Sequence, residues 1–220
     1  MESHAPANGT VTEQLTVIDH PLVADKIARL RDISTDSSRF RSLCQEVTVL
    51  TAYEALRDLP TITEQVTTPI TTTDATVLAG RSPAVVGILR AGLIMVEAIL
   101  SLLPEARVGH IGLYRDPTTH LPVEYYCKLP PDLDEREIIL VDPMLATGGS
   151  AVAAIDRLKA AGATSVRLLS IIGCPEGVAA VYARHGDVAV TLAALDERLN
   201  EHAYIVPGLG DAGDRIYGTL

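Results

Sequence analysis

Residues 137–150 of the chain read EIILVDPMLATGGS, and this stretch decides the fold. Its first part is apolar, as in a strand that is buried on both faces of a parallel sheet. Asp142 stands at the tip of this strand, and Gly148 and Gly149 precede a helical pattern. The stretch therefore predicts a strand, a short loop and a helix that begins at Ser150.

Each part of this loop has a chemical use. The two glycines allow the backbone to approach a ligand closely, and the NH groups of residues 146–150 then point at one spot before the helix N-terminus. Such a spot suits a phosphate monoester. Thr147 and Ser150 add hydroxyl donors, whereas Asp142 repels phosphate and suits sugar hydroxyls or a metal ion. The combination indicates a sugar phosphate.

The same loop permits other interpretations. A bare TGGS can be a strand-to-helix turn with Ser150 as the N-cap. The loop lacks the lysine of a GxxxxGK[ST] phosphate loop, and it is not a GxGxxG dinucleotide turn. Nucleotide hydrolysis and hydride transfer are therefore disfavoured.

Strand and helix patterns alternate on both sides of this loop. Such alternation predicts an α/β fold with a mainly parallel sheet flanked by helices, whose ligands lie at the carboxyl ends of the strands. The loops after Leu89, Tyr114 and Val141 are therefore the places to search. The expected strands cover 84–89, 108–114, 137–141, 165–172 and 188–192, the expected helices 21–31, 36–57, 91–103, 150–161 and 175–185, and an extended arm 121–128.

The two ends of the chain differ from this alternating part. Residues 1–14 are small and polar and are expected to form a loose tail, which leaves residues 15–220 as a single domain. Residues 196–220 are rich in glycine, with too little periodicity for a helix or a central strand. We expect them to form an irregular hood over the strand ends.

Composition restricts the function classes. The chain has 220 residues, 47% of them hydrophobic, and a formal net charge of -10. Such a charge disfavours nonspecific binding to nucleic acid or to an anionic membrane. Cys44, Cys127 and Cys174 are odd in number and lack CxxC spacing, which disfavours a disulfide framework and a zinc site. No apolar run suits a signal peptide or a membrane span, so a cytoplasmic location is expected.

The sequence resembles the phosphoribosyltransferase family, whose phosphate loop is an apolar strand, acidic residues and a TGG turn. Most members carry two consecutive acids there, but here Pro143 follows Asp142, as in the uracil phosphoribosyltransferase branch with its DPMLATGGS loop. The resemblance extends from about Asp19 to Leu220. Its other motifs are HPLVADKIARLRDISTDSSRFR (20–41), GILRAGLIM (87–95), GLYRD (112–116) and NEHAYIVPGLGDAGDRIYG (200–218).

The sequence around Arg90 and His202 also limits their roles without reference to the family. A guanidinium at a buried strand tip needs an anion or a carboxylate, so Arg90 is predicted to bind a ligand or to form an internal salt bridge. His202 has no suitably spaced nucleophile or metal ligand, and it is expected to be a hydrogen-bonded structural histidine. Arg115 alone is typical of a solvated charge.

The resemblance assigns roles to residues. It implies catalytic roles for Asp142, Asp211 and Arg90, and no dedicated metal ligands. It implies uracil contacts at Ile205, Gly210, Asp211 and Ala212. It implies phosphoribosyl diphosphate (PRPP) contacts at Arg90, Arg115, Asp142, Pro143, Met144, Leu145, Ala146, Thr147, Gly148, Gly149, Ser150 and Asp211.

The resemblance further implies transfer of the 5-phosphoribosyl group of PRPP to uracil, giving UMP and pyrophosphate. Mg²⁺ would be carried mainly by PRPP, the chain would form a homo-oligomer, and GTP would activate it as in some members. A purine or orotate enzyme would show paired acids after Val141 and a different C-terminal pocket. An RNA-binding regulator on the same fold would need a basic face, and a catalytically dead subunit would lack motif residues.

Overall fold

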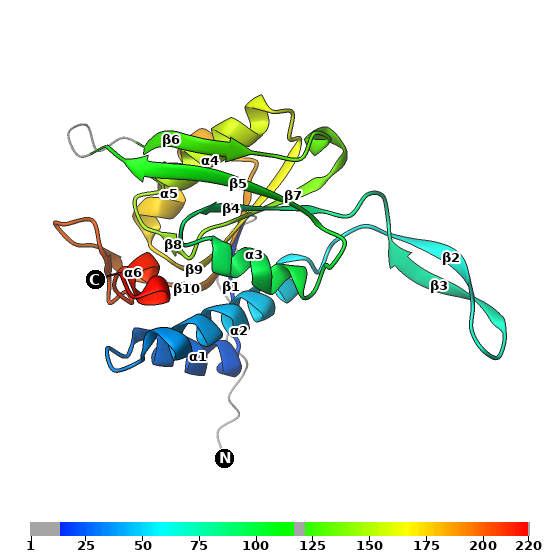
Figure 1. Cartoon of the computed structure of the whole chain (residues 1–220), viewed down its shortest axis with the longest axis horizontal. Coiled ribbons are helices and arrows are strands. Elements are labelled where there is room, and N and C mark those ends of the chain that lie inside the picture. The colour runs from blue at the N-terminus through cyan, green and yellow to red at the C-terminus, as the bar shows by residue number, and fades with distance from the viewer. Residues whose placement is uncertain (1–13, 117–121, 220) are drawn as a thin grey trace, which may run out of the picture.

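A computed structural model describes residues 14–116 and 122–219 (Figure 1). Its main sheet has eight strands in the order β1-β10-β9-β7-β4-β5-β6, with the short β8 paired to β9. All pairs are parallel except β5 with β6, which confirms the predicted α/β fold. The strands are β1 (Leu15–Val17), β4 (Ala84–Leu89), β5 (Arg107–Arg115), β6 (Pro122–Lys128), β7 (Glu137–Val141), β8 (Met144–Leu145), β9 (Ser165–Gly173) and β10 (Ala189–Leu195).

Helices cover both faces of the sheet (Figure 1). In β7, Ile139 and Val141 pack into one buried cluster with α1, α2, α3 and α6, whereas Ile138 and Leu140 pack into a second cluster with α4 and α5. This alternation explains why the strand is apolar throughout. The helices are α1 (Pro21–Arg31), α2 (Ser37–Ala55), α3 (Leu93–Leu100), α4 (Gly149–Ala160), α5 (Pro175–Arg184) and α6 (Ala212–Tyr217), with a 3-10 turn at Leu133–Glu135.

The strand β1 and one β-hairpin have no counterpart among the sequence predictions. The strand β1 adds to the sheet edge beside β10. The strands β2 (Thr61–Thr67) and β3 (Thr72–Leu78) form a separate antiparallel hairpin that projects from the body (Figure 1). The predicted arm at 121–128 is observed as β6, apart from Leu121, which lies outside the described residues.

The C-terminal segment corrects one prediction. Residues 196–211, called the hood from here on, are irregular apart from the short pair β11 (Arg198–Leu199) and β12 (Ile205–Val206). Residues 212–217, however, form α6 rather than irregular structure. The helix is too short to show a helical period in sequence, and the Asp211 carboxylate caps it by accepting a hydrogen bond from the Asp214 NH at 2.9 Å.

Cys44, Cys127 and Cys174 are all free, and burial raises the pKa of the Cys44 thiol to about 12. None of the described helices combines the length and the apolar character needed to cross a membrane.

Candidate active site

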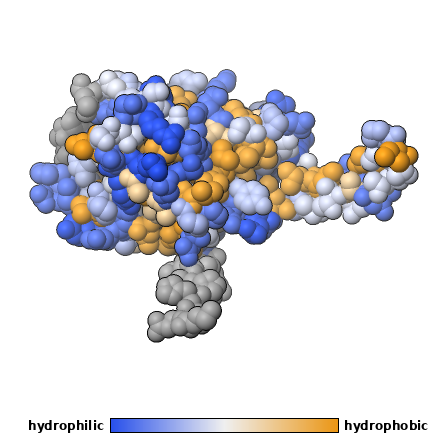
Figure 2. Space-filling model, turned by 90° about the horizontal axis from the view of Figure 1, so that it is seen from below, coloured by the Kyte–Doolittle hydropathy of each residue, from blue (hydrophilic) through white to orange (hydrophobic). Residues whose placement is uncertain are grey.

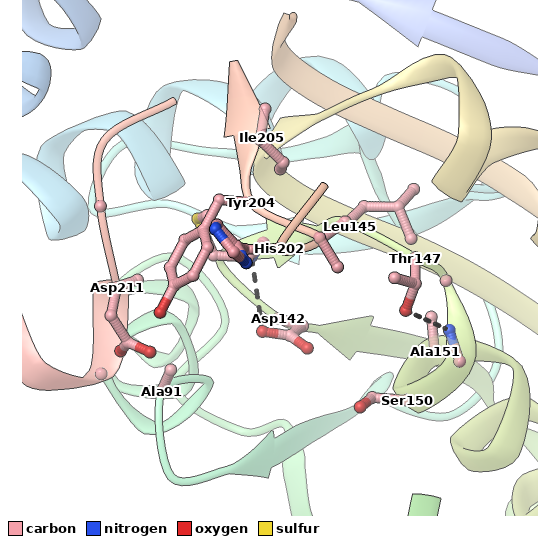
Figure 3. Close-up of a pocket in the computed structure, with 18 of the residues that line it drawn as sticks. Ala91, Asp142, Leu145, Thr147, Ser150, Ala151, His202, Tyr204, Ile205 and Asp211 are labelled. Atoms are coloured by element: carbon pink, nitrogen blue, oxygen red, sulfur yellow. Dashed lines mark hydrogen bonds between the residues drawn. The ribbon is translucent and has the colours of Figure 1, made fainter. Parts of the chain in front are cut away.

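A cavity of about 430 Å³ opens at the carboxyl ends of β4 and β7, between the loop after β7 and the hood (Figure 3). This is the end of the sheet at which the sequence predicts the ligand site. Figure 3 shows Asp142 between two sides, with Thr147 and Ser150 on one and Tyr204 and Asp211 on the other. The predicted residues that line the cavity are Arg90, Asp142, Met144, Leu145, Ala146, Thr147, Gly148, Gly149, Ser150, Ile205, Gly210, Asp211 and Ala212.

Two predicted ligand contacts do not join this set. Pro143 is buried outside the cavity lining, and its carbonyl accepts hydrogen bonds from the NH groups of Ile171 and Ile172 at 3.1 and 3.0 Å. Pro143 therefore couples the loop to β9. The backbone of Arg115 ends β5, whereas its side chain lies outside the described residues.

The phosphate loop, residues 142–150, ends in a helix that has no side-chain cap. Helix α4 begins at Gly149, one residue earlier than predicted, and its N-cap is Gly148 at φ +78°. Ser150 therefore lies inside the first turn, so the interpretation of TGGS as a Ser-capped turn is wrong. Its hydroxyl faces the cavity, and the helix start retains NH groups for an anion.

Close packing against α5 holds this loop from behind. A Cβ on Gly148 would lie 2.8 Å from the Gly177 carbonyl oxygen, and a Cβ on Gly177 would lie 2.5 Å from the carbonyl oxygens of Leu145 and Ala146. The Cys174 thiol also donates to the Ala146 oxygen at 3.1 Å. The loop conformation thus exists before any ligand arrives, which lowers the entropy cost of binding.

Asp142 lies on the cavity floor with its carboxylate largely surrounded by protein. Burial raises its pKa to about 7, and the Met144 NH, which donates to Oδ1 at 3.4 Å, acts in the opposite direction. The ionised form is therefore poorly solvated and gains from a cation or from hydroxyl donors.

Arg90 corrects the burial argument made from the sequence. Its side chain is 58% exposed, and Asp214 is 3.9 Å away, a distance that makes a weak ion pair. The turn after β4 does press against β7, because a Cβ on Gly92 would lie 2.6 Å from the carbonyl oxygens of Ile88 and Val141. The exposed guanidinium is thus available at the mouth of the cavity.

The hood and the first residue of α6 offer backbone donors to the cavity, beside the side chains of His202, Tyr204 and Asp211. The NH groups of Gly210, Asp211 and Ala212 have no hydrogen-bond acceptor within the described part of the chain. Ile205 lines the cavity, yet it is only 4% exposed because its side chain packs into the core. Its contact with a ligand would therefore come from the main chain.

Several lining residues were missed or misjudged. Tyr204, Ala91, Ala151 and Gly213 line the cavity, and each is a sequence neighbour of a predicted residue. His202 also lines it, with a side chain 73% exposed and Nε2 3.7 Å from Glu201, so the expectation of a hydrogen-bonded structural histidine is wrong. Their positions next to the motif residues in the sequence were the signal that could have identified these lining residues.

The described residues contain no cluster of three or more His, Cys, Asp or Glu side chains that could hold a metal ion. Asp142 and Asp211 nevertheless place two carboxylates on the cavity wall. One or two carboxylates together with substrate phosphate oxygens are what Mg²⁺ requires. The donor set thus fits a metal ion that arrives with its substrate.

The family model for uracil phosphoribosyltransferase matches residues 17–219. The chain belongs to the uracil phosphoribosyltransferase family. It is 59% identical over 206 residues to the uracil phosphoribosyltransferase of Symbiobacterium thermophilum and 58% identical to that of Thermus thermophilus, covering 94% of this chain and 99% of each relative.

Solved structures share this fold. A protein from Aquifex aeolicus superposes with a TM-score of 0.89 at 34% identity, covering 93% of this chain and 98% of that one. The adenine phosphoribosyltransferase of Giardia lamblia gives a TM-score of 0.55 at 18% identity, covering 79% and 97% respectively, and shows the shared fold alone.

Proposed function

We propose that this chain transfers the 5-phosphoribosyl group of PRPP to uracil, giving UMP and pyrophosphate. The observation that carries the proposal is the cavity itself, in which a preformed phosphate loop faces a hood of unpaired backbone NH groups (Figure 3). The two walls match the two ends of the product. A nucleoside monophosphate has a phosphate at one end and a flat base at the other.

The loop of residues 146–150 would hold the 5-phosphate of PRPP. Its backbone NH groups, the hydroxyls of Thr147 and Ser150 and the start of α4 all supply donors. Arg90, at the mouth of the same cavity, would hold the diphosphate. We assign Arg115 to the diphosphate as well, on the family resemblance.

Asp142 would orient the ribose hydroxyls between these two anchors. Asp142 and Asp211 would help to hold an Mg²⁺ ion that arrives with PRPP, and such an ion would supply positive charge to the departing diphosphate. A carboxylate with a pKa near 7 becomes fully ionised once such a cation is close. The assignment of a catalytic role to Asp142, Asp211 and Arg90 rests on these positions.

The reaction requires positioning more than covalent catalysis. The N1 atom of uracil forms a bond to the anomeric carbon of PRPP, the bond from this carbon to the diphosphate oxygen breaks, and N1 loses its proton. The family resemblance implies inversion without an enzyme nucleophile. The residues of the two walls hold both reactants in line, and the fixed charges favour the developing positive charge on the sugar.

The hood would read the edge of uracil, which presents an acceptor, a donor and an acceptor. NH groups from Gly210, Asp211 and Ala212 and the carbonyl of Ile205 match that order. Cytosine replaces the ring donor by an acceptor and one carbonyl by an amino group. Two buried mismatches would follow, each costing about 1 to 3 kcal/mol.

We also propose that the chain works as a homo-oligomer. The hairpin β2–β3 exposes Ile62, Val66, Ile70 and Leu78, and Figure 2 shows apolar surface both on the hairpin and on the body at its base. A two-stranded hairpin is marginally stable by itself, so a second copy is a suitable cover. Light scattering during gel filtration tests this, and a monomer at micromolar concentration would contradict it.

A panel of bases tests the proposed activity. The purified chain is mixed with PRPP and Mg²⁺ and with uracil, cytosine, orotate, adenine or guanine, with and without GTP. We expect pyrophosphate release and UMP with uracil, and GTP raises the rate if the suggested activation holds. Release with a purine or orotate instead of uracil would contradict the proposal. Tight binding of RNA in a separate filter-binding assay, without turnover of any base, would favour a regulator.

A further inference from the structure

The last turn of α6 faces Arg90 from across the mouth of the cavity. The Tyr217 hydroxyl donates to the backbone oxygen of Arg90 at 3.0 Å, and the Arg90 Cζ lies 5.7 Å from the centre of the Tyr217 ring. Asp214, one turn earlier, has its Oδ1 3.9 Å from Nη2 of Arg90. Three separate features of one helix therefore meet one arginine.

Arg90 has few other restraints. Its carbonyl also accepts from the Leu93 NH at 3.2 Å, but in the described part of the chain Asp214 is the one acidic side chain within ion-pair distance of its guanidinium. A long side chain that is 58% exposed samples many rotamers. Ordering such a side chain in one conformation costs conformational entropy.

The helix that makes these contacts is itself fixed. The guanidinium of Arg215 donates to the carbonyls of Leu30 and Asp32 at 2.5 and 2.6 Å, and it stacks over the Phe40 ring at 4.3 Å. Arg41 donates to the Ile216 oxygen at 2.9 Å. The helix is thus anchored to α1 and α2 and provides a firm support for Arg90.

The same helix begins at the base-reading wall. Its N-cap is Asp211 and its first residue is Ala212, both of which line the cavity. One short element therefore touches the proposed uracil site at its start and the proposed diphosphate arginine at its end.

We propose that Tyr217 and Asp214 are positioning residues, which hold Arg90 toward the diphosphate of PRPP and tie its position to the uracil wall through α6. The inference rests on the proposed function. The hydroxyl of Tyr217 fixes the backbone, its ring guides the guanidinium, and Asp214 orients the charge. At 3.9 Å the Asp214 pair is weak, so Arg90 can exchange it for a phosphate oxygen.

The phenol of Tyr217 is available as a donor at neutral pH. Its side chain is 38% exposed, and a tyrosine hydroxyl ordinarily keeps its proton well above pH 7. The hydroxyl can therefore donate to the Arg90 carbonyl, as observed.

The test uses the full chain with PRPP, Mg²⁺ and uracil. Tyr217→Phe keeps the ring but removes the hydroxyl, and Asp214→Asn keeps the shape but removes the charge. Each is expected to raise the KM for PRPP about 3- to 10-fold, with the KM for uracil changed less than twofold. Tyr53→Phe, an exposed tyrosine of α2, serves as the matched control and should change neither constant.

A double-mutant cycle separates positioning from a merely structural role. The loss caused by Tyr217→Phe should largely disappear in an Arg90→Lys background, because the group to be positioned is already altered. Additive losses, or equal rises in both KM values, would overturn the proposal. If Tyr217→Phe fails to fold, the Asp214→Asn cycle with Arg90→Lys decides in its place.

The turnover of the wild type distinguishes failure of the proposed function from failure of the positioning role alone. If the wild type forms no UMP from uracil, the proposed function itself fails. If the wild type forms UMP while Tyr217→Phe and Asp214→Asn both keep the PRPP KM within twofold, the function stands and the positioning role is rejected.

Discussion

The two walls of the cavity are built in different ways. The phosphate loop is made by neighbouring residues, because β7, the loop and α4 follow one another along the chain. The hood is held by residues far away in sequence: Arg31 donates to Asp196 across 165 positions and to the Gly208 carbonyl across 177. A local wall can be inferred from a motif, whereas a wall held by distant partners requires the structure.

This difference predicts separable defects. Changes behind the hood should impair uracil and spare PRPP, and changes in the loop should do the reverse. The following substitutions test that separation, from the largest expected effect to the smallest.

Gly208→Ala should have the largest effect. Gly208 has φ +65°, and a Cβ there would lie 2.2 Å from the Ile205 oxygen, the carbonyl assigned to uracil. The hood must move, so we expect kcat/KM for uracil to fall by at least about 100-fold, a loss of roughly 3 kcal/mol.

Gly80→Ala is the matched control, because Gly80 has φ +75° with open space around its Cβ position. It should lose some stability and keep activity. Near-normal uracil turnover in Gly208→Ala would contradict the assignment of this carbonyl.

Asp196→Ala should come next. Asp196 is 6% exposed, its Oδ2 accepts hydrogen bonds from Arg31 at 2.8 Å and from the Gly208 NH at 2.9 Å, and its removal leaves Arg31 without its anion. Because the Arg31 side chain is 25% exposed and water can replace part of the lost pair, we expect the free energy of unfolding to fall by about 1.5 to 3 kcal/mol. In the folded fraction, PRPP affinity measured by calorimetry should remain within threefold while the KM for uracil rises.

Thr147→Ala reverses this pattern. The change removes a hydroxyl donor to a charged acceptor and should weaken PRPP binding by about 1.5 to 3 kcal/mol. Thr164→Ala, at the opposite end of the sheet just before β9, is the control. Unchanged PRPP affinity in a folded Thr147→Ala chain would show that this wall does not bind the 5-phosphate.

Asp142 links the stability of the fold to pH. Its folded-state pKa of about 7 lies above the ordinary value of 3.8, so its contribution to stability is greatest below about pH 4 and is lost as the pH rises toward 7. Asp142→Asn removes the cost of ionising a buried carboxylate. The melting temperature of the variant minus that of the wild type should therefore be larger at pH 8 than at pH 5. The turnover of the variant with saturating Mg²⁺ should be lower than that of the wild type.

An equal melting difference at both pH values would contradict the raised pKa. Unaffected turnover would count against a catalytic Asp142. The two readouts are independent, because melting is measured without substrate.

The sequence was sufficient wherever the determinants are local. The apolar run before Asp142 predicted β7, and the glycines predicted the turn into α4 within one residue. The hairpin β2–β3 was missed, although alternating Thr and Val residues around Pro69 were a usable signal. β1 has only three residues, which is too few for any period to appear.

For the site, too, local determinants could be predicted from the sequence and distant ones could not. Loop residues such as Thr147 line the cavity, because the motif fixes their spacing after β7. The burial of Arg90 was predicted wrongly, since the end of a buried strand does not determine where a long side chain points. The Asp211 cap of α6 is a local contact with the Asp214 NH, but the helix is too short to show a period in sequence. The anchoring of α6 by Arg215 depends on contacts with α1 and the loop after it, which no local pattern encodes.

The most direct test of the central claim compares uracil with cytosine. Both bases are given to the wild-type chain with saturating PRPP and Mg²⁺, and kcat/KM is measured for each from nucleotide formation. A backbone hood that matches the uracil edge predicts a preference on the order of 10³ or more, from two mismatches of about 1 to 3 kcal/mol each. Use of cytosine within tenfold of uracil would contradict it.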